Sequence, residues 1–166
     1  FYEVHGRILN TLSLSYMLPA DTDESSLLHR IIQFIFDGRI YVGPVKETLQ
    51  FGLYRHILDL GTGQGAWAVD LCDEFCWVHS PVNVGIDSHG RPQVYVTGVD
   101  VVPIQFEFEI WDIDTPHMPY DDTSFDPVHA WFVHTGISDY PRFVSEVRRL
   151  LRDSGLVILI ELDLFC

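Results

Sequence analysis

The amino-acid sequence predicts an α/β domain built on a doubly wound, mostly parallel sheet. Apolar, strand-like runs alternate with helical patterns along the 166 residues, and this alternation is typical of a parallel sheet with helices on both faces. In addition, residues 55–71 (RHILDLGTGQGAWAVDL) pass from an apolar run through three glycines into a helical pattern. A strand, a glycine turn and a helix in that order indicate the first unit of a nucleotide-binding sheet.

The chain before this unit is predicted to be helical or irregular. Residues 1–20 hold few charged groups and end beside a proline, so we expect an irregular or docking segment there. Over residues 21–36, apolar side chains recur at helical spacing behind capping candidates and acidic residues, a pattern that predicts a helix. A further helical turn is expected within residues 45–54. We therefore divide the chain into an N-terminal segment, 1–54, that docks on a core, 55–166.

Four further strand-like runs and two helical patterns complete the predicted core. One helix is expected over residues 66–75, directly after the glycine turn, and another over 139–152. One run alternates apolar and acidic residues, as in a strand with one wetter face, and the last is almost wholly apolar, as in a strand buried in a parallel sheet. The five predicted strands lie at residues 57–60, 95–101, 106–111, 125–133 and 156–162.

The composition argues against several kinds of partner. The chain holds 24 acidic and 10 basic residues, with a formal charge of −14, so it lacks the positive surface that binds nucleic acids or anionic membranes. No apolar run approaches the roughly 18 residues of a membrane span. The three cysteines and eight histidines show no zinc-ligand spacing, and we expect no metal. Few cysteines and no signal-like N-terminus favour an intracellular setting, cytoplasmic or nuclear.

The glycine turn has a chemical purpose as well as a structural one. Gly61, Gly63 and Gly65 let the chain reverse tightly and let a ligand lie against bare backbone, which a Cβ atom would obstruct. The helix that follows offers unpaired N–H groups to polar parts of the ligand. Dinucleotides, S-adenosylmethionine (SAM) and other nucleosides all fit such a turn, and an isolated match can also be a plain loop.

Several motifs together resemble the class I SAM-dependent methyltransferases, which have a Rossmann-like fold. Residues 59–65 (DLGTGQG) resemble their first motif, GVD ending at Asp100 resembles their second-strand acid, and residues 111–114 (WDID) resemble their third-strand acid loop. Residues 124–137 (SFDPVHAWFVHTGI) and 146–161 (EVRRLLRDSGLVILIE) resemble the fourth strand, its helix and the fifth strand.

A narrower resemblance is to the fungal LaeA-like methyltransferases, which are associated with control of secondary metabolism. It is carried by residues 16–30 (YMLPADTDESSLLHR) and 133–143 (VHTGISDYPRF). In the wider class I fold two more strands follow the fifth. We therefore expect this chain to be a C-terminally truncated fragment without those strands, and hypothesise that it is inactive alone.

The resemblance implies SAM as the cofactor and assigns residues to it. Asp100 would accept hydrogen bonds from the ribose hydroxyls, since a carboxylate suits two donors, although an exposed strand-end acid is the alternative. Asp112 and the amide of Ile113 would meet the adenine, and Asp59 would brace the glycine loop or neighbour the amino group of the ligand. The expected cofactor-binding residues are Asp59, Gly61, Thr62, Gly63, Gly65, Asp100, Asp112 and Ile113.

One spacing departs from the family pattern. Asp100 lies 39 residues after Gly61, whereas a dinucleotide-binding sheet places its acid about 20 residues on. The excess contains a second strand-like run that ends at Asp87, so Asp87 is the alternative ribose acid. We favour Asp100 because GVDVVPIQ matches the family better. Residues 77–94 are then interpreted as an insertion or a mis-spliced segment.

Catalytic residues are left unassigned. The SAM sulfonium supplies the driving force for methyl transfer, so the protein has mainly to place a nucleophile in line with the methyl group. His134, after the fourth predicted strand, is a weak candidate for a general base. We favour a structural role for it, at the start of the next helix.

Three functions follow from these observations. The leading one is a SAM-dependent methyltransferase whose methyl acceptor is unidentified. The second is a non-catalytic module that keeps the fold and works with a protein partner in a regulatory complex. The third is a nicotinamide-dependent oxidoreductase, because GTGQGA also satisfies the dinucleotide glycine pattern.

Overall fold

The computed structural model describes residues 1–50, 54–75, 93–101 and 109–161. A five-stranded parallel sheet lies at its centre, in the order β5-β4-β3-β6-β7. The prediction of a five-stranded, doubly wound parallel sheet is confirmed. The strands of this sheet are β3 (Tyr54–Leu60), β4 (Gln93–Asp100), β5 (Glu109–Ile110), β6 (Phe125–Trp131) and β7 (Leu151–Ile160).

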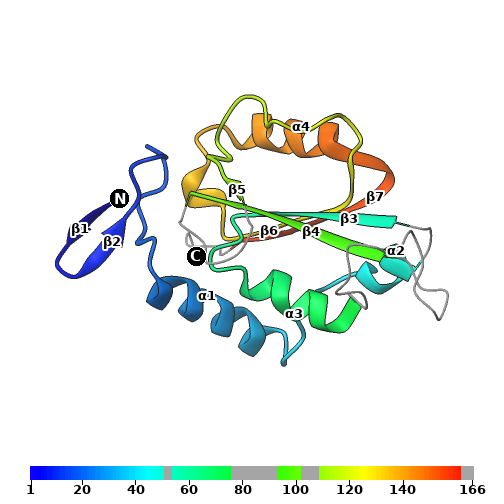
Figure 1. The fold of residues 1–166 in the computed structure, drawn as a ribbon, viewed down its shortest axis with the longest axis horizontal. Helices are drawn as coiled ribbons and strands as arrows, with labels where there is room; N and C mark the ends of the chain where they lie inside the picture. The colour runs from blue at the N-terminus through cyan, green and yellow to red at the C-terminus, as the bar shows by residue number, and fades with distance from the viewer. Residues whose placement is uncertain (51–53, 76–92, 102–108, 162–166) are drawn as a thin grey trace.

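Helices cover both faces of the sheet. Figure 1 shows α1 (Thr22–Ile35), α2 (Val45–Gln50) and α3 (Ala66–Phe75) on one face and α4 (Tyr140–Leu150) on the other. Asp21 caps α1 by accepting a hydrogen bond from the Glu24 amide at 3.1 Å. Such caps satisfy backbone donors that have no partner inside the helix.

The core is divided by the sheet into two apolar clusters. Neighbouring residues of β3 point to opposite faces, so Ile57 packs beneath α2 and α3 while Leu58 packs beneath α4. Both side chains are fully buried. On the α4 side, Phe143 and Leu150 complete the cluster. Helices on both faces therefore bury the second half of β3, from Ile57 to Leu60, at the centre of the fold.

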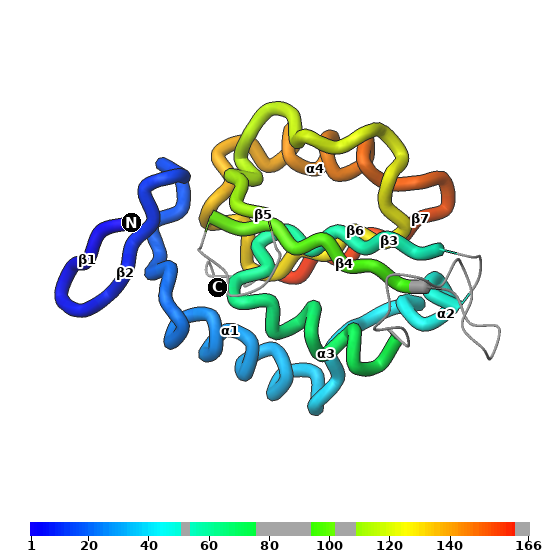
Figure 2. Tube along the Cα trace, viewed as in Figure 1, coloured from blue at the N-terminus to red at the C-terminus, as the bar shows by residue number. Residues whose placement is uncertain are grey.

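The N-terminal segment differs from its prediction. Residues 2–9, expected to be irregular, form an antiparallel hairpin of β1 (Tyr2–Val4) and β2 (Arg7–Leu9). His5 and Gly6 make the turn with φ angles of 50° and 79°, which suits the left-handed geometry of a two-residue hairpin turn. Figure 2 shows the hairpin standing away from the parallel sheet, beyond the N-terminal end of α1.

The junction between α4 and β7 also differs. The helix was expected to reach residue 152 and the strand to begin at 156, but α4 ends at Leu150 and β7 begins at Leu151. Leu151 pairs with Phe125, and the register then shifts before Pro127. Gly155 lies within β7. A Cβ atom there would lie 2.5 Å from the backbone oxygen of Asp126, so glycine allows two strands to approach closely.

Some predictions concern residues outside the described ones. Asp87, most of the interpreted insertion at 77–94, and residues 106–108 of the third predicted strand lie there. The described part of β4 begins at Gln93 and runs to Asp100.

Asp126 ties three strands together at the end of the sheet away from the glycine turn. This residue is 2% exposed, and its carboxylate accepts hydrogen bonds from the Arg55 side chain, from the His56 amide at 2.8 Å and from Arg152 Nη1 at 2.7 Å. These donors belong to β3 and β7, whereas Asp126 belongs to β6. Two cations and an amide therefore compensate a buried carboxylate, as burial of a charge requires.

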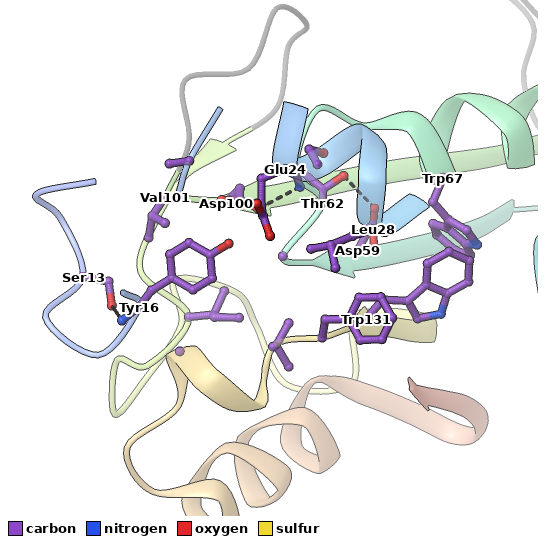
Figure 3. A pocket seen from close by; sticks show the side chains of 18 of the residues that line it. Ser13, Tyr16, Glu24, Leu28, Asp59, Thr62, Trp67, Asp100, Val101 and Trp131 are labelled. Atoms are coloured by element: carbon purple, nitrogen blue, oxygen red, sulfur yellow. Dashed lines mark hydrogen bonds between the residues drawn. The ribbon is translucent and has the colours of Figure 1, made fainter. Parts of the chain in front are cut away.

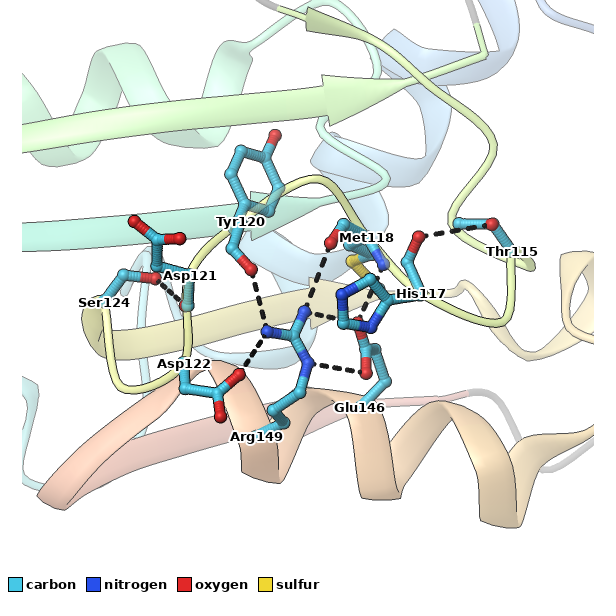
Figure 4. Close-up of polar contacts among 9 residues, drawn as sticks. All are labelled: Thr115, His117, Met118, Tyr120, Asp121, Asp122, Ser124, Glu146 and Arg149. Atoms are coloured by element: carbon cyan, nitrogen blue, oxygen red, sulfur yellow. Dashed lines mark hydrogen bonds and ion pairs between the residues drawn. The ribbon is translucent and has the colours of Figure 1, made fainter.

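A second polar network anchors the loop before β6 on α4 (Figure 4). Arg149 donates to the Tyr120 carbonyl at 2.8 Å, to Asp122 Oδ1 at 2.7 Å and to Glu146 Oε1 at 2.6 Å. Glu146 Oε1 also accepts the Met118 amide at 2.7 Å. The hydrogen bonds from Arg149, although opposed by burial, hold the pKa of Glu146 below its usual value, so this carboxylate stays ionised while it supports the loop.

Replacement of Asp126 by Asn should lower the free energy of unfolding by about 2 kcal/mol, because the Arg55, Arg152 and His56 hydrogen bonds lose their charged acceptor. Asp153→Asn, the same substitution at an exposed residue of β7, is the matched control and should change stability by less than about 0.5 kcal/mol. Urea unfolding measures both. Equal stabilities for the two variants would contradict the role assigned to Asp126.

Candidate functional site

A cleft opens at the carboxyl ends of the central strands, where the turn after β3 lies between β4 and β6 (Figure 3). In sheets of this topology, ligands bind where neighbouring connections leave in opposite directions. The N-terminal segment covers one side of the cleft through Ser13 and Tyr16, and α1 contributes Glu24 and Leu28. Residues far apart in the sequence therefore share one cavity.

The first part of the glycine turn, Gly61 to Gly63, forms the floor of this cleft, whereas Gly65, which was also expected to bind the cofactor, is not among the lining residues. Gly61, Gly63 and Gly65 adopt φ angles of 72°, 58° and 77°, a region that side-chain-bearing residues rarely enter. The amides of Gly61 and Thr62 donate to the Val99 carbonyl at 2.8 and 3.1 Å, so the turn is fastened to the end of β4.

The space around the turn also excludes side chains. A Cβ atom at Gly61 would lie 2.7 Å from Val133 Cγ1, and one at Gly63 would lie 2.5 Å from Ser25 Oγ. Ser25 belongs to α1 and accepts the Gln64 amide at 3.2 Å. Helix α1 therefore packs directly on the glycine turn.

Asp100 lies beside the turn at the end of β4. Its side chain is 9% exposed, and Oδ2 accepts the Gly63 amide at 2.7 Å. Figure 3 shows the Tyr16 hydroxyl directed toward Asp100 from the N-terminal segment. Burial, together with the negative charge of Asp100, raises the pKa of Tyr16 to about 12, so the phenol stays a neutral hydrogen-bond donor at neutral pH.

Asp112 and Ile113 lie next to Asp100 on the loop that follows β5. The Trp111 amide donates to the Asp100 carbonyl at 3.0 Å, which brings the loop to the end of β4. Asp112 Oδ1 accepts the Asp114 amide at 3.0 Å. Both Asp112 and Ile113 line the cleft and are half-buried. The sequence-predicted residues of the second and third strands are thus brought to one wall.

Asp114 fastens the N-terminal segment across this wall. Its carboxylate accepts hydrogen bonds from Ser15 Oγ at 2.9 Å, from the Ser138 amide at 3.0 Å and from Arg142 Nη2 at 2.9 Å. Burial opposes ionisation of Asp114, but the Ser138 and Ser15 hydrogen bonds and the Arg142 charge lower its pKa. A single carboxylate therefore connects the N-terminal segment, the loop after β5 and the start of α4.

Asp59 heads a buried network that includes a residue the sequence analysis missed. Its Oδ2 accepts Thr62 Oγ1 at 2.6 Å, and its Oδ1 contacts His129 Nδ1 at 2.6 Å. Asp59 and His129 are partners in the parallel register of β3 and β6. Trp67 stacks on the His129 ring with centroids 3.5 Å apart and an interplanar angle of 4°. Only the strand register could have identified His129, because 70 residues separate it from Asp59.

His134, the weak candidate for a general base, lies outside the lining of this cleft. It is exposed and begins the short helix η1 (His134–Gly136). Its amide donates to both carboxylate oxygens of Glu161 at 3.2 Å, and its ring lies 5.3 Å from that of Tyr140. These contacts are those of a helix start. A catalytic role for His134 stays a prediction.

Within the four described segments, no group of three or more His, Cys, Asp or Glu side chains is arranged to hold a metal ion. In the same part of the chain, no helix has both the length and the apolar character needed to cross a membrane.

The sequence is similar to a known protein family and to curated fungal proteins. The family model described as "Methyltransferase domain" matches residues 22–166. The secondary metabolism regulator LaeA of Coprinopsis cinerea is 31% identical over 166 residues, covering 97% of this chain and 39% of the relative. The protein-methionine methyltransferase LaeA of Emericella nidulans is 26% identical, covering 98% of this chain and 41% of the relative. The chain therefore spans about two fifths of the length of these curated relatives.

Solved structures share the fold at low sequence identity. A chain in the complex between the Haloferax volcanii Trm112 methyltransferase activator and a methyltransferase matches with a TM-score of 0.52 and 18% identity, covering 82% of this chain and 55% of that one. A Methanococcus maripaludis protein described as an S-adenosyl-L-methionine-dependent methyltransferase matches with a TM-score of 0.50 and 13% identity, covering 87% of this chain and 65% of that one.

Substitution of Gly63 by Ala should destabilise the protein more than substitution of Gly38 by Ala. Both glycines have positive φ angles, but a Cβ atom meets Ser25 only at Gly63, whereas nothing lies within 4 Å at Gly38. Gly38→Ala should cost about 1 kcal/mol from backbone strain alone, and Gly63→Ala about 2 kcal/mol or more because a clash is added. Thermal unfolding compares them, and Ser25→Ala should recover part of the Gly63→Ala loss. Identical losses at the two glycines would argue against close packing of α1 on the turn.

Proposed function

The chain belongs to the methyltransferase domain family, and from this premise we propose that it is a SAM-dependent methyltransferase with its cofactor in the cleft at the ends of β3, β4 and β6. SAM is the cofactor that this family implies. One observation carries the proposal for the site: the glycine turn and Asp100 lie on the floor of the same cleft and are joined by a hydrogen bond of 2.7 Å.

The arrangement of the cleft supports a nucleoside lying over β4 and β5. Asp100 lies at the β4 end, on the side of the cleft where ribose hydroxyls would be held, with Asp112 and the Ile113 amide next to it on the following loop. Asp100 is 9% exposed and accepts the Gly63 amide of the glycine turn, so it is not the exposed strand-end acid that was the alternative.

The charge of the cleft favours SAM over a nicotinamide dinucleotide. Five acidic side chains line the cleft, and none of the described lining residues is Lys or Arg; the acids are Asp21, Glu24, Asp59, Asp100 and Asp112. Arg7, from outside the lining, pairs with Asp21 and Glu24, so these two add little net negative charge to the cleft. A dinucleotide carries a pyrophosphate, which such a cavity repels, whereas SAM carries a positive sulfonium and an ammonium group. The oxidoreductase alternative is therefore the weaker one.

The chemistry that SAM supplies when bound is transfer of its sulfonium methyl group to a nucleophile. The task of the chain is to hold the cofactor in a fixed pose and to exclude water around it. Tyr16 and Leu28 cover the cleft from outside the sheet, as this task requires. The acceptor is unassigned, and His134 is proposed as a base only for an acceptor that reaches the surface beside η1.

For the whole protein we propose a role like that named for its LaeA relatives, regulation of secondary metabolism. A protein partner in a regulatory complex belongs to the same proposal. The proposed regulatory role rests on a resemblance that covers about two fifths of the length of those relatives. A module that binds SAM without transferring its methyl group is the alternative, and the binding experiment below distinguishes the two.

The binding of SAM and of its demethylated product S-adenosylhomocysteine is directly measurable. Each at about 100 times its dissociation constant should stabilise the protein by about 2.7 kcal/mol, seen as a rise in the midpoint of thermal unfolding. NAD and NADP at the same concentration should produce no rise. A folded protein that responds to neither SAM nor its product would contradict the proposal. Binding without methyl transfer to any acceptor would favour the non-catalytic module.

Asp100→Asn should weaken SAM binding by at least about tenfold, because hydrogen bonds to a charged group contribute roughly 1.5–3 kcal/mol. Asp73→Asn removes the same charge from an exposed position on α3 and should leave the affinity unchanged. Isothermal titration calorimetry on the two variants gives the comparison. Equal SAM affinities of the two variants would exclude Asp100 as the ribose acid and would favour Asp87, the alternative.

A further inference from the structure

His129 is a buried, cleft-lining side chain to which the proposed function assigns no task. It is 1% exposed and fixed on two sides, by Trp67 stacked at 3.5 Å and by Trp131 with ring centroids 4.7 Å away. Its Nδ1 meets Asp59 Oδ1 at 2.6 Å. Because the two tryptophans prevent rotation of the His129 ring, the fold fixes the direction in which its N–H group points.

The protonation of this pair follows from its hydrogen bonds. A carboxylate only accepts, so the proton between the two groups lies on His129 Nδ1. Burial, which outweighs the nearby negative charge of Asp59, lowers the pKa of His129, and the imidazole is neutral. The second donor to Asp59, the Thr62 hydroxyl, is neutral as well.

Asp59 therefore carries a negative charge that no cation of the described chain compensates. It is 1% exposed, and among the described residues no Lys or Arg pairs with it. This differs from Asp126, where two arginines compensate the charge. Burial of an uncompensated carboxylate costs free energy, and a positively charged group bound beside it would offset that cost. A carboxylate has about four lone-pair sites, and two remain after the Thr62 and His129 hydrogen bonds.

The position of Asp59 indicates where on a ligand that positive group lies. Asp59 belongs to β3, between the Asp100 wall of β4 and the β6 strand. A ligand with its nucleoside over β4 and β5 extends across the glycine turn toward Asp59. In that pose, a cation on the part of the ligand beyond the ribose would lie nearest to Asp59.

The methyltransferase resemblance places Asp59 near the amino group of the ligand, and we propose that His129 is the positioning residue that holds the Asp59 carboxylate toward that group and so sets how strongly the cleft prefers a ligand with the amino-acid tail. The inference rests on the proposed function, since it assumes that an adenosyl thioether binds here. His129 acts through Asp59 and takes no part in methyl transfer.

The test compares two thioethers by isothermal titration calorimetry. S-adenosylhomocysteine carries the amino-acid tail, and 5′-methylthioadenosine has the same nucleoside and sulfur without it. The wild-type protein should prefer S-adenosylhomocysteine by about 100-fold, and His129→Phe, which keeps the stacking on Trp67 but has no N–H group, should reduce that preference about tenfold or more. The affinity for 5′-methylthioadenosine should change by less than about threefold.

Two amide variants keep the test informative if the Phe variant does not fold. His129→Asn places an amide N–H close to where Nδ1–H lies and should retain most of the preference. His129→Gln places its amide near the Nε2 position instead and should lose it. Thermal unfolding of each variant verifies that it is folded before titration.

Each result decides between defined alternatives. A variant that weakens both thioethers equally, or that leaves their ratio unchanged, overturns the positioning role and leaves His129 as a packing residue. Equal behaviour of the Asn and Gln variants overturns it also. A wild-type protein that binds neither thioether overturns the proposed function itself, and the inference with it.

Discussion

The attachment of the glycine turn to the end of β4 is the constraint on which the rest of the cleft depends. The amides of Gly61 and Thr62 bond to the Val99 carbonyl, and the Gly63 amide bonds to Asp100. Because the turn leaves β3 and is held by β4, it lies at a fixed height above the sheet. Helix α1 then packs on the turn, and the Asp59 network lies directly beneath it. Any change in the backbone of the turn therefore displaces the groups proposed to bind the ligand.

Local patterns in the sequence predicted much of this arrangement. The sheet, the glycine turn and the approximate place of each described helix follow from apolar spacing and from a motif contained in a few neighbouring residues. The carboxyl ends of parallel strands meet at one edge of a sheet, which is why Asp59, Asp100 and Asp112 could be expected near one another. The β1–β2 hairpin was missed, although His5 and Gly6 carry the signal of a two-residue turn.

Side-chain contacts between residues far apart in the chain could not be predicted from the sequence. Asp59 and His129 are 70 residues apart, and Arg55 and Asp126 are 71 apart. Each pair is set by the register of β3 against β6, which no local pattern specifies. The two pairs also lie in different surroundings. Asp126 is compensated by arginines and holds strands together, whereas Asp59 is held by neutral donors. The difference between an acid that holds strands together and an acid that lines the cleft is therefore visible only in three dimensions.

The parallel order of the sheet has a consequence for how the cleft comes into being. The glycine turn is formed by consecutive residues, but the strands on its two sides are β4 and β6. Both pair with β3, and the pairing with β6 begins at Leu58 and Val128. Parallel strands cannot be joined by a tight hairpin, and closing so long a loop is slow because its entropy must be lost before the contacts form. During synthesis on a ribosome, the turn therefore emerges before the residues of β4 and β6 that lie beside it in the folded protein. The cleft therefore cannot be complete until β6 has been synthesised, although the glycine motif itself is contained in a few neighbouring residues.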